Sequence, residues 1–201
     1  MSRPRTGNKR ERLIAAAVEL FAEKGFFYTT TAEVSAQAGV AAGTLYLYFN
    51  SKDDLLVATL NTFLDEFSLE IVPSVYAADT AASKLQTFVR EFTRFIEDHR
   101  ALAQVFFIEL CQNNAALRQA ACEVWERYHS IVRDLLREVR REGYLENIDL
   151  DAAVPMLLGS IHMVSIRWLL GHDVRPPSAH AGALVRAIYR AVGVGEEVGV
   201  S

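Results

Sequence analysis

Apolar residues recur at helical spacing along nearly the whole chain. Sustained period-two alternation is absent, and the one strand-like piece, Phe26 to Thr31, is too short to build a sheet. The pattern therefore predicts an all-α fold of about nine helices. Their expected ranges are about 9–24, 31–38, 42–48, 52–72, 81–98, 102–112, 115–141, 150–170 and 178–192.

Local signals set the predicted helix boundaries. Asn8 is suited to cap the first helix, and Gly25 to end it. The run from Thr30 to Glu33 is typical of a capping box. Pro73 is expected to stop the long helix that starts near residue 51, and Asp149 to cap the eighth helix.

Two short helices joined by Gly39 and Val40 are typical of a helix-turn-helix. Such a unit places its second helix in the major groove of DNA, although an ordinary helical hairpin has the same pattern. The small residues at the start of that second helix permit close approach to base edges, and nearby hydroxyls and a lysine can bind phosphates. The predicted DNA contacts are Thr29, Thr30, Thr31, Ala42, Gly43, Thr44, Tyr46, Tyr48 and Lys52. Leu45 and Phe49 are expected to face the core of the head.

The charge is unevenly distributed. The chain of 201 residues has a net charge of −4, but residues 1–55 carry a small excess of positive charge. DNA contact confined to one end of the molecule fits this distribution. Arg3 and Arg5 are either an arm that enters a minor groove or a free tail.

The bulk composition favours a cytoplasmic protein. The longest apolar stretch, Val154 to Leu170, contains His162 and Arg167, so no membrane span and no membrane partner are predicted. Cys111 and Cys122 fit no metal pattern and are expected to be reduced.

Residues 39–55, GVAAGTLYLYFNSKDDL, resemble the DNA-binding signature of the TetR family, and the similarity extends over about residues 9–57. The resemblance implies a three-helix DNA-binding head over 1–55 and an effector-binding and dimerisation domain over 56–201. It also implies a homodimeric repressor of a palindromic operator, because a symmetric dimer requires a symmetric site.

In that family the last two helices commonly form a four-helix bundle with those of the partner. The resemblance thus implies a dimer interface near the C-terminus, with ordinary core packing as the alternative. The residues expected there are Ile161, Val164, Trp168, Val185, Ile188, Tyr189 and Val192.

Residues 108–118, IELCQNNAALR, are similar to the middle of the FadR-type, fatty-acid-responsive branch of the family. That resemblance implies a long-chain acyl-CoA effector and control of fatty-acid degradation genes. The expected lining of the acyl tunnel is Phe88, Phe92, Phe95, Phe106 and Leu110, and the expected phosphate ligands are Arg90, Arg94, Arg118 and Arg133. The alternative is a repressor of a drug-efflux gene that senses hydrophobic xenobiotics.

Other classes of protein have little support in the sequence. The five histidines are scattered without a metal-binding pair, and no glycine-rich phosphate loop is present. A helical-bundle enzyme and a helical adaptor remain remote alternatives. We expect no enzymatic activity, no metal and no cofactor other than the effector.

Overall fold

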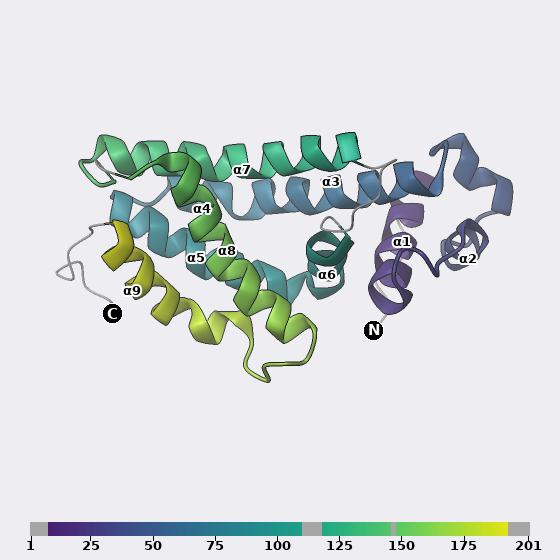
Figure 1. The fold of residues 1–201 in the computed structure, drawn as a ribbon. Coiled ribbons are helices and arrows are strands. Elements are labelled where there is room, and N and C mark those ends of the chain that lie inside the picture. Colours follow the sequence, from purple (N-terminus) through teal and green to yellow (C-terminus); the bar gives the residue numbers. More distant parts are fainter. Residues whose placement is uncertain (1–7, 110–117, 146–147, 193–201) are drawn as a thin grey trace. The chain divides into compact units, whose positions relative to one another are not determined.

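The computed structural model describes residues 8–109, 118–145 and 148–192 (Figure 1). Within these ranges the chain is helical, which confirms the predicted all-α fold. The α-helices are α1 (Lys9–Lys24), α2 (Thr31–Gln37), α3 (Lys52–Glu70), α4 (Val72–Tyr76), α5 (Ala81–Asp98), α6 (Arg100–Glu109), α7 (Arg118–Arg141), α8 (Leu150–Leu169) and α9 (Ala181–Val192). Two 3₁₀ helices accompany them, η1 (Ala42–Leu47) and η2 (Pro177–His180).

The predicted N-terminal caps are present. Asn8 and Glu11 form a capping box on α1, and Thr30 and Glu33 form one on α2. The Asp149 side chain accepts a hydrogen bond from the backbone N–H of Asp151 at the start of α8. These starts depend on residues within one helical turn, which is why the sequence pattern locates them.

Several helix boundaries differ from prediction, and two of the differences have a clear local cause. The second helix of the helix-turn-helix is the 3₁₀ helix η1, and Gly39 precedes it with φ of 64°, a left-handed conformation that suits glycine. Pro73 does not end a helix. It lies in the first turn of α4, where its missing N–H costs no hydrogen bond, and α3 ends before it at Glu70.

The chain forms two compact units, which are residues 1–63 with 101–124 (unit 1) and residues 64–100 with 125–201 (unit 2). The units are defined by contacts and leave the functional segments 1–55 and 56–201 a prediction; α6, which follows residue 55, packs in unit 1. The Gln104 side chain donates a hydrogen bond to the Ala22 carbonyl at 2.7 Å, and the Phe106 ring stacks on Phe63 with centroids 4.0 Å apart.

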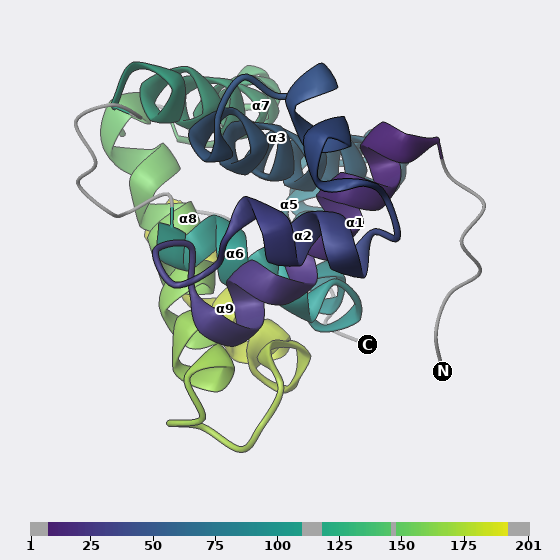
Figure 2. The ribbon, with the colours of Figure 1, turned by 90° about the vertical axis from the view of Figure 1, so that its right-hand side faces the viewer.

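In unit 1, α1 packs against α2, and α2 packs against η1 (Figure 2). In unit 2, α5 is the central helix and contacts α4, α8, α9 and η2. One face of α5 is fully buried, including Leu85, Phe92 and Ile96. The Tyr189 hydroxyl of α9 donates to the Ala82 carbonyl of α5 at 2.5 Å, which anchors α9 on that helix.

Candidate DNA interface and effector site

The 3₁₀ helix η1 is held to unit 1 by two buried side chains. Leu45 is fully buried and Phe49 nearly so, as the sequence predicts. Ser35 of α2 donates to the Ala42 carbonyl at 3.5 Å. Anchoring on this side leaves the opposite side of η1 to solvent, where Ala42, Gly43, Tyr46 and Tyr48 are exposed.

The three predicted threonines occupy different positions. Thr31 and Tyr46 share a hydrogen bond between their hydroxyls at 3.1 Å, so both stand at the exposed edge of α2 and η1. Thr30 is exposed but serves as the cap of α2. Thr29 is buried, and its hydroxyl donates to the carbonyls of Leu20 and Gly25 at 3.3 and 3.0 Å. This placement gives Thr29 a structural role and removes its hydroxyl from the surface.

Lys52 was expected to bind a phosphate, but its ammonium group is engaged within unit 1. Its Nζ lies 2.8 and 3.0 Å from the carbonyl oxygens of Phe26 and Thr29, and 3.4 Å from that of Phe27. It also lies 4.3 Å from the centroid of the Phe26 ring. The Lys52 ammonium has three N–H donors, one for each of these three carbonyls. Lys52 therefore holds the loop between α1 and α2 in place.

Other charges of the head are likewise used internally. The Arg12 guanidinium donates to the carbonyls of Ala38 and Gly39, which end α2. The hydrogen bond from Lys24 lowers the pKa of Glu33 to about 2, and the Thr30 backbone N–H adds to this shift. The η1 segment itself carries no charged residue, although the exposed Arg10 of α1 lies over the Phe49 ring at 5.5 Å.

Exposed apolar residues of the head that the sequence did not point to are Phe27, Tyr28 and Leu47. Leu47 is 81% exposed and Tyr28 is 83% exposed. The predicted burial of Leu45 and Phe49 implies that a residue between them, such as Leu47, faces outward.

Unit 2 contains a buried aromatic cluster centred on Phe67 of α3. The Phe67 ring centroid lies 5.1 Å from Phe92, 5.7 Å from Tyr128, 6.1 Å from Phe95 and 6.2 Å from Phe88. Three predicted effector residues, Phe88, Phe92 and Phe95, thus meet in one place. Edge-to-face contacts between aromatic rings stabilise the folded state beyond the effect of burying their surface.

A polar pair lies within this cluster. The Tyr128 hydroxyl is 2.6 Å from His162 Nε2, and the two rings stack with centroids 5.5 Å apart. Burial lowers the pKa of His162 to about 4, with a further contribution from His129. Burial also raises the pKa of Tyr128 well above its ordinary value. Near neutral pH, the hydroxyl therefore donates to a neutral imidazole.

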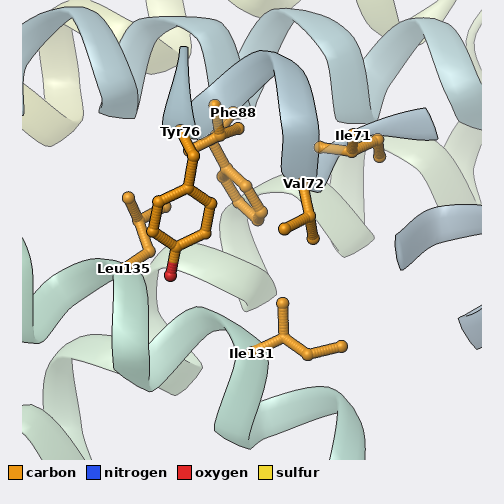
Figure 3. Close-up of a pocket in the computed structure, with 7 residues that line it drawn as sticks. Ile71, Val72, Tyr76, Phe88, Ile131 and Leu135 are labelled. Atoms are coloured by element: carbon orange, nitrogen blue, oxygen red, sulfur yellow. The ribbon is translucent and has the colours of Figure 1, made fainter. Parts of the chain in front are cut away.

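A small apolar pocket with about 10 Å³ of space, partly open to solvent, lies beside the cluster. Figure 3 shows Tyr76 over this pocket, next to Phe88 of α5 and Leu135 of α7. Ile71, Val72, Val75 and Ile131 complete its lining. Of the predicted tunnel residues, Phe88 alone lines it. Phe106 belongs to unit 1, and Leu110 lies outside the described residues.

The predicted phosphate ligands lie on different elements. Arg90 and Arg94 are exposed one turn apart on α5, and Arg94 pairs with Glu91 at 3.6 Å. Arg133 of α7 pairs with Asp151 at 3.0 Å. The side chain of Arg118 lies outside the described part of the chain.

Four residues expected at the dimer interface are already covered within one chain. Ile161, Val185, Ile188 and Tyr189 are each at most 5% exposed, so they have almost no area left to bury against a partner. Val164 and Trp168 are half-buried, and Arg100 lies over the Trp168 ring at 4.5 Å. The Val192 side chain lies outside the described residues.

Glu66, Glu70 and His99 of unit 2 are close enough together to hold a metal ion. However, Glu66 faces His99 Nδ1 at 2.9 Å, whereas Glu70 faces Nε2 at 3.0 Å. Each ring nitrogen of His99 therefore has one carboxylate neighbour. Among the described helices, α8 alone has the length and apolar composition to cross a membrane. The core helix of a protein without membrane spans can meet the same criteria.

The exposed η1 and the aromatic unit 2 define the class of protein as a helix-turn-helix DNA-binding regulator with a separate helical body. Residues 13–59 match the family described as bacterial regulatory proteins, tetR family. Residues 58–180 match the C-terminal region of YsiA-like proteins. The chain belongs to the TetR family.

Its relatives include fatty-acid regulators. The chain is 33% identical to the fatty acid metabolism regulator protein of Bacillus subtilis over 164 residues, which are 81% of this chain and 84% of the relative. The structure resembles FadR from Bacillus subtilis in complex with stearoyl-CoA, with a TM-score of 0.82, 28% identity and coverage of 92% and 99% of the two chains. FadR from Bacillus halodurans matches with a TM-score of 0.82, 27% identity and coverage of 89% and 96%. These relatives are transcriptional regulators, not enzymes.

Proposed function

We propose that this protein is a dimeric repressor that binds a palindromic operator and is released by a long-chain acyl-CoA. The observation that carries the effector assignment is the wholly carbon-lined wall of the pocket between α4, α5 and α7. The similarity to a FadR solved with stearoyl-CoA supports the same class of ligand. An acyl chain needs apolar walls, and its CoA phosphates need cations outside them.

The pocket must enlarge to take such a chain. Its space of about 10 Å³ is barely enough for one water molecule, whereas typical ligand sites measure roughly 300–1,000 Å³. Val72 and Ile131 are only partly buried, and Tyr76 is 46% exposed, so these side chains can move at lower cost than the buried Phe92. The ligand would thus select a conformer in which α4 lies farther from α7. It can change operator occupancy only by its differential affinity for the two conformers.

The proposed dimer uses the exposed face of α8 instead of the buried residues. Met156, Met163 and Leu170 are 43, 59 and 52% exposed and recur every seven residues. This spacing places them on one side of the helix. Gly159 is also exposed and has open space where a Cβ would lie, which allows close approach of a second helix. Sedimentation of Met163→Glu should show loss of the dimer, whereas Val174→Glu, a change at a 94% exposed position, should not.

The effector is tested with an operator obtained by selection from random duplex DNA. Stearoyl-CoA should weaken operator binding about 5- to 150-fold, the usual range of allosteric coupling. Acetyl-CoA, which has the same headgroup but no long chain, should have little effect. Release by hydrophobic drugs but not by stearoyl-CoA would instead support the drug-efflux alternative and contradict the proposal.

A substitution that fills the apolar pocket tests whether this pocket is the acyl site. Val72→Trp should bind the operator normally but lose its response to stearoyl-CoA, because the indole occupies the pocket. Val174→Trp makes the same change at an exposed position of unit 2 and should respond like the wild type. Equal responses of the two variants would argue against this pocket as the acyl site.

A further inference from the structure

The helix-turn-helix has almost no charge of its own. Between residues 25 and 51 the sequence contains one charged residue, Glu33, and no lysine, arginine or histidine. Glu33 is bonded to Lys24 at 2.7 Å and caps α2. The commonest specific contact with DNA is Arg or Lys to guanine, and an acidic residue can accept from cytosine. Residues 25–51 contain no cation that could bind guanine, and their one carboxylate, Glu33, is already hydrogen-bonded to Lys24.

The amide side chains of the same segment are also engaged. Gln37 donates to Glu19 at 2.6 Å, and Asn50 donates to Asp54 at 2.8 Å. Asn and Gln are the side chains that recognise adenine through two hydrogen bonds. With these interactions accounted for, the remaining specific contacts are hydroxyl hydrogen bonds and apolar contact with the thymine methyl group.

Leu47 is placed for that apolar contact. It is 81% exposed on η1, whose other side is anchored by the buried Leu45 and Phe49. Contact between the exposed Leu47 side chain and another apolar group removes apolar surface from water, which favours binding. The neighbouring Tyr46 and Tyr48 present hydroxyls that can bind phosphates on either side.

We propose that Leu47 determines sequence specificity by contacting the C5-methyl group of thymine in the major groove. Specificity then depends on shape and methyl placement, and the cations elsewhere in the head contribute affinity without sequence information. This inference rests on DNA binding by the head and is independent of the effector.

The test replaces each thymine of the selected operator, one at a time, with deoxyuridine, which lacks only that methyl group. At one or two positions the wild type should bind about three- to fivefold more weakly, the value expected for one buried methyl group. Leu47→Ala should bind the unmodified operator about tenfold more weakly and should show no deoxyuridine penalty at those positions.

Leu69→Ala is the matched control, because Leu69 is 75% exposed and belongs to unit 2. It should retain both the affinity and the deoxyuridine penalty of the wild type. Thermal unfolding would verify that Leu47→Ala is folded, as expected for an exposed side chain. No penalty at any thymine, or an unchanged penalty in Leu47→Ala, would overturn the proposal.

Discussion

The two units place the same kinds of side chain in opposite positions. In unit 1, Tyr28, Tyr46 and Leu47 are exposed, whereas the charged groups of Arg12 and Lys52 bind backbone carbonyls. In unit 2, the aromatic rings around Phe67 are buried, and many charges form pairs at the surface, such as Arg127 with Asp65 at 2.6 Å. The head thus exposes apolar and hydroxyl groups near η1, whereas the body encloses its aromatic groups.

Arg12 and Lys52 stabilise the backbone of the head, whereas Lys9 and Arg10 of α1 are exposed and η1 itself carries no charged residue. Four substitutions test the contrast, in order of decreasing effect on the free energy of unfolding.

Phe67→Ala should have the largest effect. Phe67 is fully buried and contacts four other rings, so its truncation leaves a cavity and should cost about 3–5 kcal/mol. Urea unfolding measures this cost. Leu69→Ala, two residues along α3 but 75% exposed, should change stability by less than about 0.5 kcal/mol. If Phe67→Ala and Leu69→Ala lowered the free energy of unfolding by similar amounts, Phe67 would not belong to a buried cluster.

His162 should make unit 2 sensitive to acid. Because its folded-state pKa is about 4, the unfolded chain binds a proton below pH 6.5 that the folded chain does not. Stability should therefore fall by up to about 3 kcal/mol between pH 6.5 and pH 4. His162→Gln keeps an acceptor for Tyr128 but cannot titrate. Urea unfolding at pH 7 and pH 4.5 should show a smaller loss in the variant, and an equal loss would exclude His162 as the source.

Lys52→Met should destabilise the head by about 2 kcal/mol, because hydrogen bonds from a charged donor to the loop carbonyls are lost. Hydrogen exchange of the amides in residues 25–30 measures the local effect. Lys24→Met, which removes an exposed ion pair with Glu33, should leave these amides nearly as protected as in the wild type. If Lys52→Met weakened DNA binding without faster exchange, a direct phosphate contact would be the better explanation.

Tyr46→Phe should have the smallest effect on stability, within about 0.5 kcal/mol, because its hydroxyl bonds only at an exposed edge to Thr31. Operator affinity should nevertheless fall severalfold, since the hydroxyl is a predicted phosphate contact. Tyr76→Phe makes the same change in unit 2 at a 46% exposed position and should leave operator affinity unchanged. Fluorescence anisotropy with the selected operator measures both.

Local sequence patterns predicted the helical fold, the capped starts of α1, α2 and α8, and the burial of Leu45 and Phe49. Each of these depends on residues within about one helical turn, or on a periodicity that a single helix imposes. The TetR family followed from a motif of the same local kind.

The roles of side chains whose partners are distant in sequence depend on tertiary packing. Lys52 binds carbonyls 23 to 26 residues away, and Phe106 stacks on Phe63, 43 residues earlier in the chain, within unit 1. For α8, both sides of the helix are apolar, so periodicity could not distinguish Ile161, which is buried, from Met163, which is exposed. Which side of such a helix becomes core is set by the elements that pack against it, and the sequence of the helix alone does not contain that information.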